Sequence, residues 1–332
     1  KLKQLRDPEL QPLLAQIWPG TGSPTTAEME KKIHQLAAVV RGGTGDPYAG
    51  RTLFQNTCSG CHRLFAQGAE VGPDLTVYNR TAAKAAQWAK EYGGKSAATP
   101  KEAASGCDFV MMCVGNDDDV RSVIYGVDGV LAGITQGGAA RKAKRAPIIV
   151  DHTTASATLA RELAAKCAED GVGFIDAPVS GGQAGAENGQ LSVMCGADDE
   201  AVFERAYPVL MSYAKVSKRL GNAGSGQLAK MVNQICIAGL VQGLSEGIHF
   251  AKKAGLDIEA LIATISKGAA QSWQMENRWK TMSEGKFDFG FAVEWMRKDL
   301  GIVLDEANRN GARLPTTALI DQFYSQVIAR GG

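Results

Sequence analysis

The chain has 332 residues, of which 45% are hydrophobic and 21% charged, and its formal net charge at pH 7 is +1. This length leaves room for two domains, and the composition is typical of soluble globular proteins and argues against disorder as the dominant state. Because the charge is near zero and no apolar run reaches the length of a membrane-spanning helix, we expect no nucleic-acid partner and no membrane partner, but a small molecule.

Residues 1–76 are interrupted by Pro, Gly and Thr, and only two segments have helical character. In the segment 27–40 the apolar residues recur at helical spacing, which predicts an amphipathic helix. A second short helix is expected over 48–57, and no strand is evident. Since the chain starts at Lys1 without a signal segment and stops at Gly332 without a closing element, we expect a fragment at both ends.

A haem-attachment motif follows the second of these helices. Cys58-x-x-Cys61-His62 supplies two thiols for the vinyl groups of haem c and an imidazole as an axial iron ligand. The alternative is a chance or zinc-binding Cys-x-x-Cys, which needs two further ligands, and only His34 is near in sequence. The residues after the motif resemble the haem-binding modules of c-type cytochromes, but the next methionine is Met111, inside a predicted strand. We therefore expect a mostly helical, cytochrome c-like fragment that lacks its second axial ligand.

Beyond Thr76, short β-branched runs alternate with helical stretches. Strands are expected over 75–79, 108–114, 146–153, 173–178 and 191–196, and helices over 81–93, 117–126 and 156–171. This alternation predicts an α/β, Rossmann-like domain over 77–220, with a mostly parallel, doubly wound sheet.

From Gly221 onward the strand patterns stop. Helices are expected over 227–254, 258–266, 269–284 and 293–310, which predicts an all-α domain over 221–332. Five cysteines are scattered singly in these two domains, and we expect them to be reduced, buried thiols: Cys107, Cys113, Cys167, Cys195 and Cys236.

The first strand of the α/β part ends in Asn79-Arg80-Thr81, and Thr81 can cap the following helix. In a dinucleotide-binding fold this strand end lies beside the adenosine ribose, where an acidic residue selects NAD. A guanidinium suits the 2′-phosphate of NADP, so Arg80 favours NADP. The alternative is a solvated Arg on a loop.

Two glycine-rich motifs follow the later strands. Ser180-Gly181-Gly182 combines a hydroxyl with backbone N–H groups that an anion can approach closely, so it is a candidate carboxylate site or, alternatively, a turn between two strands. The segment 224–229 has the form Gly-x-Gly-x-x-Ala, but a long helix follows it instead of a βαβ unit. We therefore do not interpret 224–229 as a nucleotide loop.

The long helix after this second motif carries Lys230, with Asn233 and Gln234 on the same face. Taken alone, a lysine early in a helix is usually a solvated side chain. His152 and His249 have no carboxylate or nucleophile near them in sequence, so we expect core or surface roles for both.

Three segments, 176–196, 221–234 and 295–301, resemble in order and spacing the β-hydroxyacid dehydrogenase family, to which 3-hydroxyisobutyrate dehydrogenase and tartronate semialdehyde reductase belong. The resemblance extends from about residue 76 to the end of the chain. It implies hydride transfer between NADP or NAD and a small 3-hydroxy acid or its semialdehyde, which the sequence does not name. It also implies a homo-oligomer, because the helical domain of this family packs into dimers or larger assemblies.

The resemblance also implies roles for individual residues. Lys230 exchanges a proton with the substrate oxygen, Ser180, Gly181 and Gly182 bind the substrate carboxylate, and Asn233 holds the substrate beside them. The residues expected to contact the cofactor are Asn79, Arg80, Thr81, Cys113, Val114, Asp118, Thr154 and Lys298. For Cys113, Val114, Asp118 and Thr154 there is an alternative: these residues end a strand or cap a helix and do not contact the cofactor.

Members of this family begin with a strand, a Gly-x-Gly-x-x-Gly turn and a helix, and none of the three precedes Val77 here. The glycine pairs at 20–22 and 43–45 are each followed closely by a proline and do not follow a strand. We therefore expect a chimera, in which a truncated cytochrome module precedes a dehydrogenase that lacks its first β-α unit and binds dinucleotide poorly.

Haem c is attached in the oxidising periplasm, whereas an NADP-dependent dehydrogenase is expected in the cytoplasm. The sequence thus leaves three function classes open. They are a cytoplasmic oxidoreductase impaired by loss of its glycine-rich loop, a haem c-binding electron carrier, and a noncatalytic helical interaction module.

Overall fold

The computed structural model describes residues 75–136, 146–287 and 289–331. Residues 76–89 and 95–332 belong to one compact unit, and the description below concerns its described part. The two helices expected at 27–40 and 48–57 and the haem motif Cys58-x-x-Cys61-His62 lie outside the described residues.

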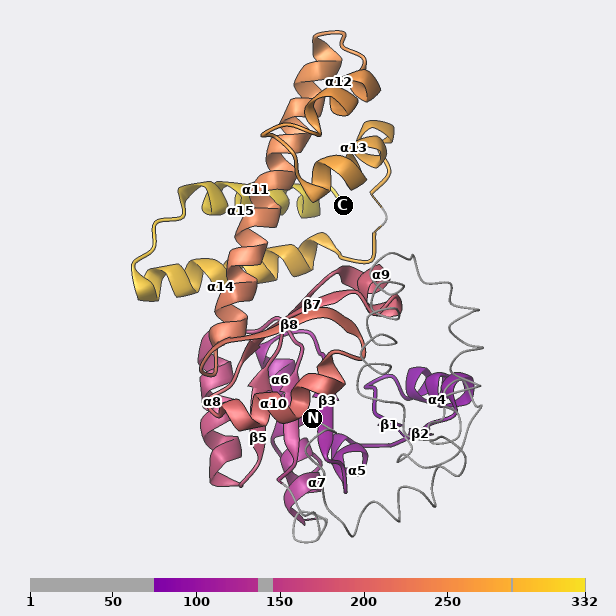
Figure 1. Cartoon of the computed structure of the whole chain (residues 1–332), viewed down its shortest axis with the longest axis vertical. Helices are drawn as coiled ribbons and strands as arrows, with labels where there is room; N and C mark the ends of the chain where they lie inside the picture. The colour runs from indigo at the N-terminus through magenta and orange to yellow at the C-terminus, as the bar shows by residue number, and fades with distance from the viewer. Residues whose placement is uncertain (1–74, 137–145, 288, 332) are drawn as a thin grey trace, which may run out of the picture. The chain divides into compact units, whose positions relative to one another are not determined.

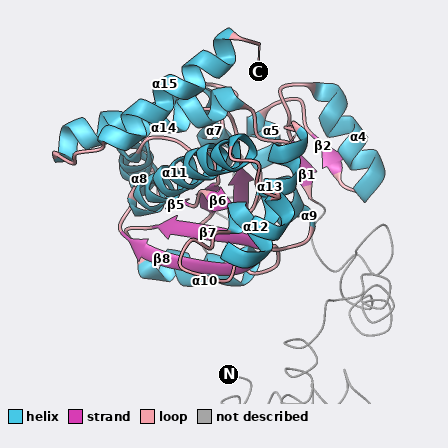
Figure 2. Cartoon of the chain, turned by 90° about the horizontal axis from the view of Figure 1, so that it is seen from above, coloured by secondary structure: helices cyan, strands magenta, loops and turns pink. Residues whose placement is uncertain are grey.

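A six-stranded sheet forms the centre of the α/β part. Its strands are β3 (Phe109–Met112), β4 (Ile148–Asp151), β5 (Gly173–Asp176), β6 (Val179–Ser180), β7 (Leu191–Gly196) and β8 (Ala214–Gly221). The order is β3-β4-β5-β7-β6, and β8 also pairs with β7, beside which it lies in Figure 2. β3, β4 and β5 are mutually parallel, as are β7 and β8, whereas β7 runs antiparallel to β5 and β6. The expected parallel sheet is therefore present in β3–β5, and the turn into β6 and β7 makes the whole sheet mixed.

Helices cover both faces of this sheet. α6 (Asp117–Ile124), α7 (Val130–Gln136) and α8 (Ala157–Glu169) share one hydrophobic core with it, and α10 (Glu200–Leu210) shares the other. All four residues of β4 are buried, because successive side chains face opposite layers. Ile149 contributes to the core on the α6–α8 side, whereas Ile148 and Val150 contribute to the core beneath α10.

Five helices make up the C-terminal domain: α11 (Ser225–Lys253), α12 (Ile258–Ile265), α13 (Trp273–Glu284), α14 (Val293–Asn310) and α15 (Pro315–Ala329). α11 packs against β7 and β8 and also against α13, α14 and α15, and is the long helix that joins them in Figure 1. Its middle contributes Ala238 to a core with α14 and α15, and its later turns contribute Leu244 and Ile248 to a core with α12 and α13. The α/β domain followed by an all-α domain is confirmed.

The first described strand does not join the six-stranded sheet. β1 (Thr76–Val77) pairs in parallel with β2 (Lys95–Ser96), and α4 (Ala82–Tyr92) connects the two. The strand expected over 75–79 is thus shorter than predicted and pairs with a segment that we had not predicted. β3 ends the six-stranded sheet, and within the described ranges no strand pairs with its outer edge.

The sequence patterns did not predict several short or proline-containing elements. These are β2, α5 (Pro100–Ala104), α7, β6, α9 (Gly182–Glu187), α10, β8 and α15. α5 is too short to show a helical period and starts at a proline after its Thr99 cap. α15 also starts at a proline, Pro315, which suits the first turn of a helix and does not mark a break there.

The expectation of buried cysteines is wrong for two of the five. Cys167 and Cys195 are buried and Cys107 is half-buried, whereas Cys113 and Cys236 are exposed. Cys113 follows the end of β3, and Cys236 lies on an outward face of α11, so neither is covered by the hydrophobic cores.

Candidate active site

One lysine ties α14 to the loops after β3 and β4. Lys298 Nζ donates to the carbonyl oxygen of Gly115 at 3.1 Å and to that of Thr154 at 2.5 Å. Gly115 follows β3 and Thr154 follows β4, so both acceptors lie beyond the carboxyl ends of parallel strands. In open α/β sheets ligands bind at this end.

Trp295, one turn before Lys298, lies over the same loop. A Cβ atom at Gly115 would come within 3.2 Å of the indole, so the ring packs directly on this glycine. Trp295 is 43% exposed, and the centre of its ring is 5.7 Å from Lys298 Nζ. We had not predicted Trp295 as a site residue, because its position depends on the packing of α14 against the β3 loop.

Lys230 reaches this region from α11. The residue is only 7% exposed, and its Nζ donates to the carbonyl oxygen of Val179 at 2.9 Å. Burial lowers the pKa of Lys230; the charge of Asp299 opposes this shift and that of Lys298 adds to it. A lysine whose pKa moves towards neutrality can both give and take a proton near physiological pH.

Asp176 fixes the start of α11, and so the position of Lys230. Its Oδ1 accepts from the backbone N–H of Gly224 at 2.8 Å, and its Oδ2 accepts from that of Gln227 at 2.9 Å. Burial raises the pKa of Asp176 to about 7, although the two backbone donors act in the opposite direction. The Asp176 carboxyl group already accepts from the backbone N–H groups that a phosphate would need. This supports our interpretation that 224–229 is not a nucleotide loop.

The glycines of this motif allow the helix to approach the sheet. A Cβ atom at Gly226 would lie 2.6 Å from the carbonyl oxygen of Asp176 and would also collide with the carbonyl oxygen of Met194. Gly224 has φ +91°, in the left-handed region that favours glycine. These residues therefore serve close packing of α11 on β5 and β7.

Ser180, Gly181 and Gly182 form the turn between β6 and α9. Gly181 has φ +135° and Gly182 φ +62°, so both positions favour glycine, and all three residues are at least partly exposed. Val179, whose carbonyl binds Lys230, immediately precedes Ser180. The structure thus places this candidate carboxylate site next to the candidate proton donor.

Asn233 lies one turn after Lys230 and takes part in a chain of polar contacts. Its Nδ2 donates to Gln234 Oε1 at 2.9 Å, and Gln234 Nε2 donates to Asp299 Oδ2 at 2.5 Å. Asp299 Oδ1 forms an ion pair with Lys298 Nζ at 3.0 Å. The chain links the helix that carries Lys230 to the helix that carries Lys298.

Backbone and side-chain contacts also fix the ends of β3 and β4. The N–H of Val114 donates to Thr153 Oγ1 at 2.9 Å, and the adjacent Cys113 is exposed. Gln227, which is 1% exposed, accepts from the N–H of Ala155 at 3.0 Å and donates to the carbonyl oxygen of Thr153 at 2.7 Å. We had not predicted this role of Gln227, whose only sequence signal is its place in the first turn of α11.

The expected ribose-side residues cluster at the end of β1. Arg80 is 86% exposed and forms an ion pair with Asp119 at 3.3 Å. Asn79 Oδ1 accepts from the N–H of Thr81 at 2.8 Å, which closes a turn before α4. The Arg80–Asp119 pair therefore joins the end of β1 to α6, the helix that follows β3.

Asp118 lies on the surface of α6. Its side chain is 98% exposed and lies 3.8 Å from Arg121, one turn further along α6. The neighbouring Asp117 instead accepts from the N–H and Oγ of Ser156, at 2.9 and 2.5 Å, and so ties the start of α6 to that of α8. No contact of the described residues joins Asp118 to Lys230 or Lys298.

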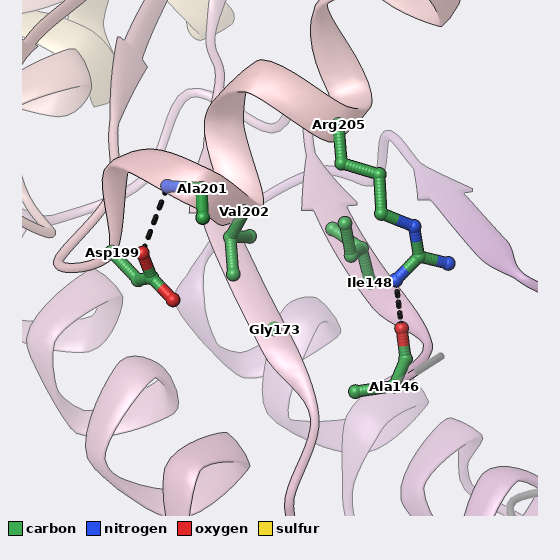
Figure 3. Close-up of a pocket in the computed structure, with 7 residues that line it drawn as sticks. All are labelled: Ala146, Ile148, Gly173, Asp199, Ala201, Val202 and Arg205. Carbon is green, nitrogen blue, oxygen red and sulfur yellow. Dashed lines mark hydrogen bonds between the residues drawn. The ribbon is translucent and has the colours of Figure 1, made fainter. Parts of the chain in front are cut away.

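A cavity of about 290 Å³ lies at the opposite end of the strands (Figure 3). It is bounded by Ile148 and Gly173, the first residues of β4 and β5, and by Val202 and Arg205 of α10. The guanidinium of Arg205 donates to the carbonyl oxygen of Ala146 across its rim. Because the candidate residues follow the carboxyl ends of the strands, this cavity is not part of their site.

The two described histidines have structural or surface positions. His152 bridges the carbonyl oxygen of Ala177, at 2.6 Å, and the hydroxyl of Tyr213, at 2.9 Å, and burial lowers its pKa. His249 is exposed on α11. Within the described ranges no three His, Cys, Asp or Glu side chains gather closely enough to hold a metal ion. The described helices include none that combines the length and apolarity of a membrane span.

Two sequence-family profiles match the chain. Residues 62–224 match the NAD-binding domain of 6-phosphogluconate dehydrogenase, and residues 224–332 match the NAD-binding domain of NADP-dependent 3-hydroxyisobutyrate dehydrogenase. The first match includes residues 62–76, which we had assigned to the cytochrome-like fragment. Neither profile describes a haem module, so these matches do not support a cytochrome domain.

Similar proteins cover most of the chain. An uncharacterized oxidoreductase of Shewanella frigidimarina is 61% identical over 261 residues, which are 79% of this chain and 86% of the relative. A probable mitochondrial 3-hydroxyisobutyrate dehydrogenase-like protein of Arabidopsis thaliana is 40% identical over 79% of this chain and 75% of its own length. The structure of Mycobacterium tuberculosis 3-hydroxyisobutyrate dehydrogenase with L-serine has a TM-score of 0.66 and 29% identity, covering 76% of this chain and 84% of that one.

These matches cover both described domains and the segments that contain Lys230, Ser180 and Lys298. The chain therefore belongs to the β-hydroxyacid dehydrogenase family, the family of 3-hydroxyisobutyrate dehydrogenase, and is an NAD(P)-dependent oxidoreductase of that family.

Proposed function

We propose that the chain interconverts a small 3-hydroxy acid and the corresponding semialdehyde, with a preference for NADP, and that Lys230 carries the proton. The observation that carries this proposal is the position of the buried Lys230 amine. It is bound to the carbonyl oxygen of Val179, directly before the Ser180-Gly181-Gly182 turn. The proposed proton donor and the proposed anion-binding turn are therefore adjacent, as the reduction of a carbonyl acid requires.

The described residues fit the nicotinamide end of a dinucleotide. Lys298 holds the loops after β3 and β4 together, and the exposed residues Cys113 and Trp295 border these loops. A bound nicotinamide would supply or accept the hydride. For the phosphate end, the sequence contains no Gly-x-Gly-x-x-Gly turn before β1, so we assign no phosphate contacts.

The chain's own residues would act on the substrate in two ways. The N–H groups of Gly181 and Gly182 and the hydroxyl of Ser180 would bind the carboxylate, with Asn233 beside the reacting end. Lys230 would give its proton to the carbonyl oxygen during reduction and take it back during oxidation. Burial of Lys230, which favours the neutral amine, makes proton release easier than for an exposed lysine.

The preference for NADP rests on Arg80. Its guanidinium is 86% exposed at the end of β1, where it is free to turn from Asp119 to a phosphate. An exposed ion pair at 3.3 Å stabilises the protein by only about 0–1 kcal/mol, so exchanging partners costs little.

The test is substrate-dependent oxidation of NADPH with a panel of 3-carbonyl acids. It is run on the chain as it stands and on a grafted chain, in which the first strand, glycine-rich turn and helix of a family member replace residues 1–74. We expect Lys230→Ala to lower turnover of the active form by roughly 10²–10⁴-fold while cofactor binding survives. The matched control is Lys253→Ala, an exposed lysine in the last turn of the same helix, which should leave turnover unchanged. Equal turnover in the Lys230 variant and the parent would remove Lys230 from the mechanism.

A second candidate function rests on the haem motif Cys58-x-x-Cys61-His62. These residues have the spacing for covalent haem c, with His62 as the iron ligand, and the chain would then be an electron carrier. The pyridine haemochrome spectrum of protein expressed with a cytochrome c maturation system decides between the two. We expect no haem in a Cys58→Ala, Cys61→Ala double variant, and a haem-free parent would exclude this function.

A further inference from the structure

Two buried polar groups near Lys230 have no part in the proton transfer described above. Asp299 of α14 is 3% exposed, and Gln234 of α11 is 2% exposed. Burying a carboxylate is costly unless charged or hydrogen-bonding partners compensate for its lost hydration. Both residues face the polar contacts between the two helices, and neither belongs to one of the hydrophobic cores.

The contacts of these groups form one continuous path. It starts at Asn233, passes through the Gln234 amide to one oxygen of Asp299 at 2.5 Å, and continues from the other oxygen to Lys298 at 3.0 Å. Lys298 in turn binds the carbonyl oxygens of Gly115 and Thr154. The path thus connects a proposed substrate residue to the loops at the nicotinamide end.

We infer that Gln234 and Asp299 are positioning residues, which keep Asn233 and Lys298 in fixed positions relative to each other in the active site. This inference rests on the proposed function. The Gln234 amide group uses its oxygen to hold Asn233 and its N–H to reach Asp299, so both ends of the amide are engaged. Asp299 places its two oxygens on different partners, so rotation of the carboxylate would break one of the contacts.

The charge of Asp299 has a second effect on the site. Lys230 is influenced by two charged groups of α14: Asp299, which favours the ammonium form, and Lys298, which disfavours it. From β6, Lys230 contacts only the Val179 carbonyl among the described residues. Removing the Asp299 charge should therefore lower the pKa of Lys230, which a purely mechanical clamp between α11 and α14 would not require.

The test uses three variants of the full chain. Asp299→Asn keeps an oxygen for Gln234 but removes the charge, and Gln234→Leu removes the amide but keeps the charge. The matched control is Asp321→Asn, which removes the buried carboxylate of Asp321 on α15. That carboxylate accepts two hydrogen bonds from Arg297, which lies on α14 like Asp299. This control should lower thermal stability without affecting the site.

The first measurement is the pH titration of Lys230 by NMR of ¹³C-labelled lysine, with the signal assigned by its absence in Lys230→Arg. It requires neither cofactor nor activity. We expect Asp299→Asn to shift the titration to lower pH and Asp321→Asn to leave it in place. A titration that is the same in all variants would overturn the role of Asp299.

The second measurement is the affinity of the chain for 3-hydroxyisobutyrate by calorimetry. We expect Gln234→Leu to weaken binding by roughly tenfold, because Asn233 loses the position from which it would hydrogen-bond the charged substrate, and Asp321→Asn to leave the affinity unchanged. Equal affinity in Gln234→Leu and the parent would overturn the role of Gln234. If the parent itself does not bind, the proposed substrate class fails and the role of Gln234 with it, while the Lys230 titration still decides the role of Asp299.

Discussion

Lys230 and Lys298 face the same end of the sheet, but their ammonium groups have different surroundings. Lys298 donates to two carbonyl oxygens, those of Gly115 and Thr154, and forms an ion pair with Asp299. Lys230 contacts one described acceptor, the carbonyl of Val179, so two of its donors remain for a substrate. This difference makes Lys298 a fixed cation that joins the loops, and Lys230 the group suited to exchange a proton.

The lowered pKa of Lys230 predicts opposite pH profiles in the two reaction directions. Reduction needs the ammonium form, so kcat/KM should fall as pH rises through a pKa below the 10.5 of an exposed lysine. Oxidation needs the neutral amine, so kcat/KM should rise through the same midpoint. The measurement is kcat/KM against pH in both directions with the grafted chain. If the pH profiles of reduction and oxidation had different midpoints, the titrating group would not be Lys230.

Arg80 predicts the cofactor preference. Arg80→Asp in the grafted chain should weaken binding of NADP more than that of NAD, because a carboxylate repels the 2′-phosphate and binds a free ribose hydroxyl. The control is Arg121→Asp, which alters an exposed arginine of α6 paired with Glu162. Calorimetry with both cofactors checks this, and an unchanged NADP to NAD ratio would contradict the assignment.

At the scale of elements, the first turn of α11 determines where Lys230 lies. A Cβ atom at Gly226 would collide with backbone oxygens of β5 and β7, whereas a Cβ atom at Gly243, further along the helix, would meet no atom within 4 Å. We expect Gly226→Ala to lower the free energy of unfolding by about 1–3 kcal/mol through overpacking. Gly243→Ala should raise it by roughly 0.5–1 kcal/mol, since alanine favours helix. Urea denaturation of both variants is the measurement, and a stable Gly226→Ala protein would show that α11 is not held this closely.

Asp176 predicts a pH-dependent stability. Burial raises its pKa to about 7 in the folded chain from 3.8, so folding favours the protonated form. The contribution to stability is therefore complete below the unfolded pKa and is lost as pH rises through about 7. In Asp176→Asn this loss is absent, so the melting temperature of the variant relative to the parent should increase from pH 5 to pH 8. Asp151, whose pKa is raised to about 6, is present in both proteins, but its charge also raises the pKa of Asp176, so the difference reports the two coupled carboxyl groups together.

The sequence predicted those elements and residues whose signals are local. The buried strand β4 and the helix α14 were predicted from their apolar patterns, whereas the roles proposed for Lys230 and Ser180 came from the family resemblance of the motifs around them. The contacts of Gln234 with Asp299, and those of Gln227 with the β4 loop, join residues 65 or more positions apart. Such pairs depend on how helices pack on the sheet, and one sequence carries no signal for them.

At the scale of the whole molecule, the order of the strands has a consequence for cofactor binding. β1, which carries Arg80 at its end, pairs with β2 and stands outside the six-stranded sheet that begins at β3. In a dinucleotide fold a further strand lies between the strands that correspond to β1 and β3, and this strand leads into the glycine turn. The pyrophosphate of the cofactor lies on the backbone amides of that turn and of the first helix. The sequence before β1 offers no such turn.

We therefore expect the chain as it stands to bind NADPH poorly, although it contains Lys230, Ser180 and Lys298, the residues that we propose for substrate and nicotinamide. The outer edge of β3 should also favour self-association, because its N–H and C=O groups have no strand partner among the described residues. The grafted chain should regain binding, because the graft supplies a family strand, the glycine amides and the first helix. Calorimetry on the two chains, with light scattering for association, is the measurement. Micromolar affinity for NADPH in the ungrafted chain would contradict this prediction and would assign the phosphate contacts to residues other than a glycine turn.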